Sequence, residues 1–376
     1  MFRSNDVFPK RIPHHAVSVT VLSAWLSLLT VLSAAEPKFP EQREIEDHFR
    51  GHYQAGIILG VVVDGREAVY SLGTKEKGEV SPIDRFTTFE IGSITKTFTA
   101  TVLADLELKG LIDRQTDFIR YFPPARRAEL DQRCRGITLH HLVTHTSGIP
   151  AMPANLGDIR EDPALLESYG VPQLVEFLGH CTLDFPPGTT HRYSNLGVSI
   201  LGYALARATG TSYEDLLQIR IFDPLGMKRS SLRLTAEQRR NMALGHDRTG
   251  EREPYWNASE VFQGSGFIKS CLHDMLIYLR TAMGIEKNAL TPAATRAVTP
   301  IAPGYPDSEI CMAWYREKIA ENLHIVCHNG STGGFYAFIG FTDSRRFGLV
   351  LLANSKITRE LESRVYDLFR THGAQP

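Results

Sequence analysis

The chain has 376 residues, of which 43% are hydrophobic and 22% are charged, and its formal net charge at pH 7 is −1. These values are typical of a globular protein with a large core, and at this length we expect two lobes. The near-neutral charge argues against nucleic acid as a partner, because proteins that bind it carry strongly basic surfaces.

The N-terminus is predicted to be an export signal. Basic residues at positions 3, 10 and 11 precede an uncharged run from Ala16 to Ala35, which ends in small residues suited to cleavage. We therefore predict a signal peptide over residues 1–35 and an exported protein, periplasmic or secreted. The run is also about long enough to span a bilayer, so an uncleaved anchor is the alternative and would be the one expected contact with a membrane.

The first elements of the mature chain are predicted to be a helix and a pair of strands. Residues 41–50 have a helical pattern, and two apolar runs within residues 56–73 are joined by Asp64–Gly65, a dipeptide typical of a tight hairpin turn. A longer amphipathic helix is predicted from Ser93 to Gly110, because glycine is frequent just after a helix C-terminus.

From residue 116 to residue 259 the sequence is helical in pattern and rich in proline. The helices expected in this stretch cover residues 137–148, 171–180 and 196–208. Strands return afterwards, and we predict them at residues 263–268, 310–316, 323–329, 335–341 and 347–353. A final helix is expected over residues 358–371.

This order of elements predicts an α/β fold of the α+β type. One antiparallel sheet would be built from residues 36–115 and 260–376, flanked by the terminal helices and interrupted by a mostly helical lobe of residues 116–259. An active site is expected where the two lobes meet, which is a common place for a cleft.

The five cysteines cannot all form disulfides, and their spacing matches no zinc motif. Cys311 and Cys327 lie on two apolar runs that resemble a hairpin turning near Ile319. The sequence is compatible with a disulfide bridge between them and equally with two buried free thiols.

Ser93 and Lys96 form a Ser-x-x-Lys pair at the start of a predicted helix. A separation of three residues puts the hydroxyl and the amine on one helix face, with Cβ atoms about 5–6 Å apart. A serine hydroxyl is a weak nucleophile, and a buried, partly deprotonated lysine can activate it. An N-cap serine followed by a surface lysine would give the same pattern, so the pair needs support from the rest of the chain.

A second polar segment, Tyr193-Ser194-Asn195, lies in a predicted loop just before a helix. A tyrosine phenolate can shuttle protons if neighbouring cations lower its pKa, and an asparagine amide can orient a substrate or a lysine. Tyr255-Trp256-Asn257 has the same spacing, but no helix is predicted behind it and we disfavour it. A half-buried loop tyrosine is the structural alternative for Tyr193.

A third segment, His328-Asn329-Gly330-Ser331, follows a predicted strand. Gly330 would let a substrate or a second backbone segment approach closely, and His328 could be a polar contact or a proton relay near neutral pH. A glycine-rich turn with an incidental histidine is the structural alternative.

Together these segments resemble the Ser-x-x-Lys, Ser-Asp-Asn and Lys-Thr-Gly boxes of the serine β-lactamase and penicillin-binding protein superfamily. The resemblance is closest to the branch with class C β-lactamases, D-alanyl-D-alanine carboxypeptidases, D-aminopeptidases and related esterases, whose second box is Tyr-x-Asn. It covers nearly the whole mature chain and implies a β-lactamase/transpeptidase-like fold.

The resemblance also implies roles for the matching residues. Ser93 would be the acylated nucleophile, Lys96 its activating partner and Tyr193 the general base. The residues implied to bind substrate are Asn195, His328, Gly330 and Ser331, and the backbone N–H groups of Ser93 and Ser331 would form an oxyanion hole. The reaction would be two-step acyl transfer from an ester, amide or β-lactam carbonyl of a small-molecule or peptidoglycan-derived substrate, with no metal or other cofactor.

His328 departs from the family pattern, in which lysine is more frequent at this position. A permanent cation there would hold a substrate carboxylate, whereas histidine carries that charge only in part near pH 7. We therefore expect esterase or D-alanine peptidase activity in preference to efficient β-lactamase activity. For an anionic substrate, kcat/KM is expected to fall as His328 loses its proton.

Two other functions compete with this one. A catalytically weak protein of the same fold could bind penicillin or peptidoglycan without turning it over. A metallohydrolase could use His141 and His145, spaced i, i+4, but the Glu of His-Glu-x-x-His is missing and no third ligand is evident. An α/β-hydrolase is disfavoured, because the Gly-x-Ser-x-Gly elbow is absent.

Overall fold

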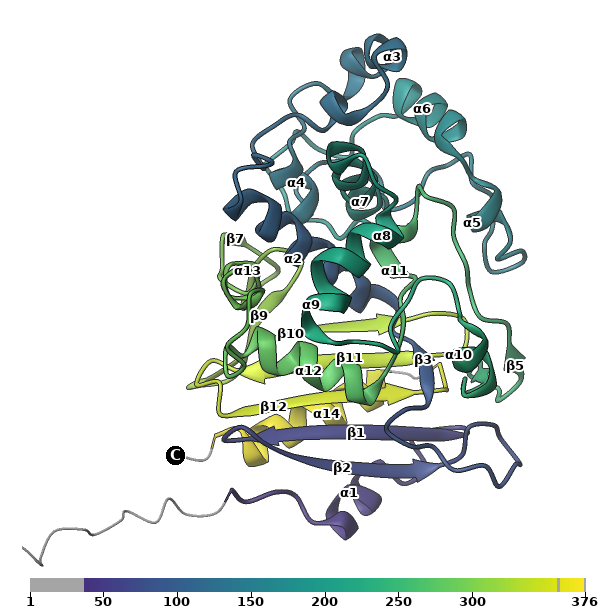
Figure 1. Ribbon diagram of the computed structural model, residues 1–376, viewed down its shortest axis with the longest axis vertical. Coiled ribbons are helices and arrows are strands. Elements are labelled where there is room, and N and C mark those ends of the chain that lie inside the picture. The colour runs from purple at the N-terminus through teal and green to yellow at the C-terminus, as the bar shows by residue number, and fades with distance from the viewer. Residues whose placement is uncertain (1–36, 357–358, 375–376) are drawn as a thin grey trace, which may run out of the picture. The chain divides into compact units, whose positions relative to one another are not determined.

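An eight-stranded antiparallel sheet dominates the computed structural model, which describes residues 37–356 and 359–374 (Figure 1). The predicted signal peptide, residues 1–35, lies outside these ranges. From residue 38 onward the chain forms one compact unit. Within the described ranges, every helix is too short or too polar to cross a membrane.

The sheet joins the two ends of the chain, in the strand order β2-β1-β12-β11-β10-β9-β8-β7. Its strands are β1 (Gly56–Val63), β2 (Arg66–Gly73), β7 (Ala302–Pro303), β8 (Ser308–Ile310), β9 (Tyr315–Ala320), β10 (Leu323–Ser331), β11 (Tyr336–Thr342) and β12 (Phe347–Ala353). The N-terminal strand β1 pairs with the last strand β12, with Ile57 opposite Ala353 and Val63 opposite Phe347. The predicted α+β fold, with an antiparallel sheet built from both ends, is confirmed.

Smaller strands and many helices complete the fold. Two-stranded sheets pair β3 (Thr88–Glu90) with β6 (Lys269–Cys271), and β4 (Gly245–His246) with β5 (Arg252–Glu253). The helices are α1 (Gln42–Phe49), α2 (Thr95–Leu108), α3 (Pro124–Cys134), α4 (Leu139–Val143), α5 (Leu165–Ser168), α6 (Val171–His180), α7 (Asn195–Thr209), α8 (Tyr213–Leu217), α9 (Asp223–Leu225), α10 (Ala236–Arg240), α11 (Gln263–Gly266), α12 (Leu272–Ala282), α13 (Thr291–Ala297) and α14 (Arg359–His372).

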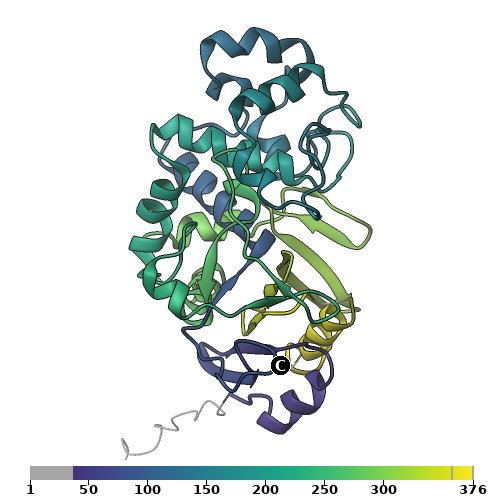
Figure 2. The ribbon, with the colours of Figure 1, turned by 90° about the vertical axis from the view of Figure 1, so that its right-hand side faces the viewer.

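The side chains of the central strands β1, β11 and β12 alternate between two buried faces of the sheet. Ile58 and Val62 of β1 face a large core shared with α2, α7 and α12. Ile57, Leu59 and Val61 face a second core under α1 and α14. Figure 2 shows α3 and α6 at the end of the molecule opposite β1 and β2. The lobe boundaries at residues 115 and 260 stay a prediction.

Two predicted strands are wrong, each for a local reason. Residues 263–266 form α11 instead of a strand, because Gly264 packs its backbone directly on Gly202 of α7 and leaves no room for side chains. The predicted strand 310–316 is split between β8 and β9, with Ala313 in the left-handed region at a φ of 56°.

β9 and β10 do form a hairpin, but it places Cys327 opposite Tyr315, whereas Cys311 lies before β9, so the pairing expected for a Cys311–Cys327 bridge is absent. All five thiols are free. Cys134 at the end of α3 instead hydrogen-bonds with Cys181, just after α6, and both sulfur atoms approach the carbonyl oxygen of Leu178, at 3.6 and 3.5 Å.

We expect mild oxidation by a small disulfide reagent to join Cys134 to Cys181 before any other pair forms. Two thiols become one disulfide, and the reagent takes two electrons and two protons. Closing this loop would stabilise the fold by about 4 kcal/mol by chain entropy alone. Peptide mapping without reductant would identify the bridge, and a Cys134→Ser variant should not form it. A Cys311–Cys327 bridge in the same map would contradict the expectation.

Candidate active site

Ser93 lies at the entrance to α2, where β3 leads through the short 3-10 turn Gly92–Ile94 into the helix. Gly92 has a φ of 50°, which favours glycine. A Cβ atom there would also lie 2.7 Å from the backbone nitrogen of Ser331. The sequence therefore brings the Ser93 segment into direct contact with the end of β10.

Lys96 is fully buried, and its Nζ atom has three close partners. It lies 3.0 Å from Ser93 Oγ, 2.8 Å from Asn195 Oδ1 and 2.5 Å from the backbone carbonyl oxygen of Ser265. Burial lowers the pKa of Lys96 well below its ordinary value of 10.5.

These partners fit a neutral amine. Such an amine has two N–H groups and one lone pair, and Asn195 Oδ1 and the Ser265 carbonyl can only accept. In that form both N–H groups are used, and the lone pair is left for the Ser93 hydroxyl, which can donate. This arrangement suits removal of the Ser93 proton by Lys96. The contribution of Ser265 could not have been predicted, because a backbone carbonyl has no residue signature.

Tyr193 lies in the loop before α7, and Ser194 caps that helix by accepting the Gly197 N–H at 2.9 Å. The Tyr193 phenol hydrogen-bonds with Ser93, and Lys96 Nζ lies 4.9 Å from the centre of its ring. Burial raises the pKa of Tyr193 above its ordinary value of 10. Burial therefore disfavours the phenolate form of Tyr193 at rest.

The third segment occupies the end of β10, where Gly330 pairs with Ala337 of β11. A Cβ atom on Gly330 would collide with the carbonyl oxygen of Ile91 and would lie 2.9 Å from the backbone nitrogen of Ser93. The structure thus brings the backbones of Ser93 and Ser331 together beside the Ser93 side chain. An oxyanion hole requires this proximity, and the roles of these amides stay a prediction.

His328 is 3% exposed, and burial lowers its pKa to about 3. Its Nδ1 atom hydrogen-bonds to the backbone carbonyl of Asn329, which can only accept, so the proton is on Nδ1. Burial therefore argues against a His328 that is partly cationic near pH 7, whereas the expected fall in kcat/KM as it deprotonates stays a prediction. The sequence could not show that the ring would be packed among aromatic side chains.

The sequence suggests only a metal-binding role for His145, but its ring lies against Tyr193, with ring centres 4.6 Å apart. Its Nδ1 accepts the Ser194 N–H at 3.2 Å, and Nδ1 of His141 accepts the Thr138 N–H at 3.2 Å. The Nδ1 atom of each of these two histidines thus already accepts a backbone N–H group. Across residues 37–356 and 359–374, no three His, Cys, Asp or Glu side chains are arranged to hold a metal ion. The geometry favours a positioning role for His145.

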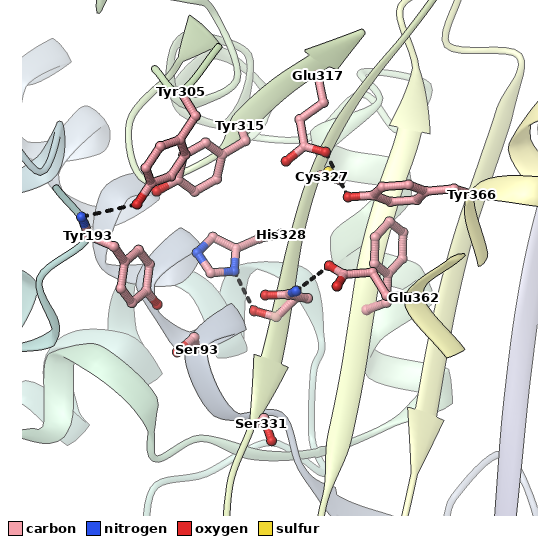
Figure 3. Close-up of a pocket in the computed structure, with 12 residues that line it drawn as sticks. Ser93, Tyr193, Tyr305, Tyr315, Glu317, Cys327, His328, Ser331, Glu362 and Tyr366 are labelled. Atoms are coloured by element: carbon pink, nitrogen blue, oxygen red, sulfur yellow. Dashed lines mark hydrogen bonds between the residues drawn. The ribbon is translucent and has the colours of Figure 1, made fainter. Parts of the chain in front are cut away.

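Two cavities meet at Ser93 and Ser331. The larger, about 370 Å³, is lined by polar and aromatic side chains that include Tyr193, Tyr305, Tyr315, Glu317, His328 and Glu362 (Figure 3). The smaller, about 90 Å³, is lined mainly by apolar side chains that include Met152, Ile159, Leu166 and Phe262. Ser93 can therefore meet a carbonyl whose two substituents lie in different surroundings.

Comparison with known proteins gives consistent matches. The family model described as Beta-lactamase matches residues 43–370. A beta-lactamase of Pseudomonas fluorescens is 26% identical over 332 residues, covering 80% of this chain and 88% of that protein. The D-alanyl-D-alanine-carboxypeptidase/endopeptidase AmpH of Escherichia coli (strain K12) is 26% identical over 349 residues, covering 86% of each.

Solved structures support the same fold. A class C beta-lactamase superposes with a TM-score of 0.76 at 23% identity, covering 89% of this chain and 98% of that one. The D-alanine carboxypeptidase AmpC from Burkholderia cenocepacia has a TM-score of 0.73 at 23% identity, covering 88% and 97%.

Proposed function

Because the chain belongs to the beta-lactamase family, we propose that it is an exported serine hydrolase that forms an acyl-enzyme at Ser93. The observation that carries the proposal is the environment of Lys96, a buried amine with two fixed acceptors and the Ser93 hydroxyl as its third partner. Export rests on the basic residues and apolar run before residue 36.

The first half of the proposed reaction is acylation. Lys96 removes the proton of Ser93 as Oγ attacks the carbonyl carbon of the substrate. The N–H groups of Ser93 and Ser331 donate to the developing oxyanion, each worth about 3–4 kcal/mol of barrier in comparable sites. Tyr193, hydrogen-bonded with Ser93, passes a proton to the leaving group as the bond to it breaks, and takes in its place the proton that Lys96 removed from Ser93. Asn195 holds Lys96 and orients the substrate.

The second half is hydrolysis of the acyl-enzyme. Water enters where the leaving group was, and Tyr193 together with Lys96 takes its proton. The pair delivers this proton to Ser93 Oγ as the bond from Oγ to the acyl carbon breaks, so the carboxylic acid leaves and the Ser93 hydroxyl is restored. No cofactor takes part in this scheme.

The neutral state of His328 supports an esterase, or a peptidase whose substrate has no carboxylate at this end, rather than an efficient β-lactamase. An anionic substrate finds no positive charge at this position, and burying an unpaired carboxylate is unfavourable. An ester or amide without a carboxylate at this end avoids that cost.

Labelling of Ser93 tests the proposal. Incubation with a fluorophosphonate should add one adduct per chain, which peptide mass spectrometry should place on Ser93, and the wild type should hydrolyse p-nitrophenyl acetate. Ser93→Ala should take up no label, whereas Ser168→Ala, at an exposed serine of α5, should be labelled like the wild type. Absence of both label and turnover in folded protein would reject the hydrolase.

A stable acyl-enzyme would instead support the alternative, a catalytically weak protein that binds penicillin or peptidoglycan. That alternative predicts stoichiometric labelling by a fluorescent penicillin without multiple turnovers of any ester. Intact-mass measurements over time would separate a persistent adduct from a transient one.

A further inference from the structure

The larger cavity beside Ser93 contains two carboxylates and no cationic side chain among its lining residues. Glu317 of β9 accepts a hydrogen bond from the Tyr366 hydroxyl at 2.7 Å, and Glu362 of α14 accepts one from Asn329 Nδ2 at 2.5 Å. Both donors are neutral, so neither carboxylate is paired with a cation there. Burial raises the pKa of Glu317, and a cation entering the cavity would lower it again.

His328 adds an unused acceptor to the same cavity. Because its proton is on Nδ1, the Nε2 atom carries a lone pair, and within the described part of the chain this buried atom has no hydrogen-bond partner. Figure 3 shows the ring between Tyr193 and Tyr315 on one side and Glu362 on the other. A buried acceptor without a partner is unfavourable, and a ligand N–H or O–H would satisfy it.

Aromatic rings form the remaining wall. Tyr305 and Tyr315 are stacked with ring centres 6.1 Å apart, and the His328 ring lies 5.8 Å from Tyr315. Faces of tyrosine rings attract cations when water is excluded. The carboxylates, the free Nε2 and the rings thus favour the same ligand, a positively charged group with N–H or C–H donors.

The position of Tyr193 indicates which part of the substrate occupies this cavity. Tyr193 lines the larger cavity, and in the proposed reaction it gives a proton to the leaving group. The leaving group therefore lies among the carboxylates. The acyl group then occupies the smaller cavity of about 90 Å³ beside Asn195, about three water volumes and enough for an acetyl or propionyl group.

On the basis of the proposed function, we propose that the substrate is a short-chain acyl ester or amide whose leaving alcohol or amine carries a positive charge. Ser93 Oγ forms a bond to the acyl carbon, the bond from that carbon to the leaving oxygen or nitrogen breaks, and the leaving atom takes the proton from Tyr193. Water then releases the short-chain acid and returns a proton to the site. This substrate class excludes peptides that end in a carboxylate on the leaving-group side.

Three thioacetates that differ in leaving-group charge test the proposal, with each kcat/KM divided by the hydroxide-catalysed rate constant of the same compound. They are S-acetylthiocholine, its neutral isostere 3,3-dimethylbutyl thioacetate, and S-acetyl-3-mercaptopropionate. We expect kcat/KM for the cation to exceed that for the neutral compound by about tenfold or more, and the anion to be the poorest of the three. In each of the variants Glu317→Gln and Glu362→Gln, the ratio of kcat/KM for the cation to kcat/KM for the neutral compound should fall by about threefold or more.

The control is Glu79→Gln, which removes the same charge at an exposed position after β2, outside both cavities. Its ratio should equal that of the wild type. Equal kcat/KM for the cation and the neutral compound, or a preference for the anion, would overturn the proposal. The hydrolase function still stands after either of these outcomes if Ser93 turns over the neutral thioester. If the folded protein, not labelled beforehand, turns over none of the three thioacetates, the hydrolase function itself is rejected.

Discussion

Replacing Lys96 with methionine will lower kcat/KM for a neutral short-chain ester by about a thousandfold, the usual size of a lost general base. Methionine fills a similar volume but has no lone pair basic enough to take the Ser93 proton. Initial rates with p-nitrophenyl acetate would measure the loss. Since the change also removes the hydrogen bonds to Asn195 Oδ1 and the Ser265 carbonyl, thermal unfolding must be measured in parallel.

The pH dependence gives a readout that a purely structural role would not change. Burial disfavours the ammonium, so Lys96 loses its proton well below its ordinary pKa of 10.5. Wild-type kcat/KM should therefore rise with pH through that lowered pKa and then level off, and Lys96→Met should lack this rise. Lys109→Met, just beyond α2 and paired with Asp105, is the control and should keep both rate and profile. If Lys96→Met keeps the wild-type rise of kcat/KM with pH, that rise reports the titration of another group.

Much of this site could be predicted because the three segments are local patterns with fixed spacing. Ser93 and Lys96 are one helical turn apart, and Tyr193 and Asn195 lie on either side of Ser194, which caps α7. The fold followed from the order of strand and helix patterns. The strand at 263–268 failed because its glycines mark a contact between two helices, which composition alone does not distinguish from a strand end.

The electrostatics of the site could not be predicted, because they depend on burial. A lysine, a tyrosine and a histidine in sequence carry their ordinary pKa values, and only burial lowers the pKa of Lys96 and His328 and raises the pKa of Tyr193. Glu317 and Glu362 were not singled out either. They come from a strand and a helix that the sequence gives no reason to place beside Ser93.

Replacing Gly330 with alanine will lower kcat for the same ester by about a hundredfold or more, the cost of losing an oxyanion-hole donor. The added Cβ atom cannot be accommodated by a side-chain movement, because its neighbours are the backbone of Ile91 and the amide nitrogen of Ser93. Either β10 or the Ser93 segment must shift, and both amides proposed to bind the oxyanion then lose their common geometry. KM should change less than kcat, since those contacts form fully only in the transition state.

The matched control is Gly179→Ala in α6, where the nearest atom to the new Cβ is 3.6 Å away. Alanine is favoured over glycine inside a helix by about 0.5–1 kcal/mol, so this variant should be slightly more stable and fully active. Circular dichroism and thermal melts establish that Gly330→Ala is folded at the assay temperature. Fluorophosphonate labelling then completes the argument, because a folded Gly330→Ala protein should react slowly at Ser93 although every catalytic side chain is present. Labelling at the wild-type rate would mean that the Ser331 amide does not stabilise the oxyanion.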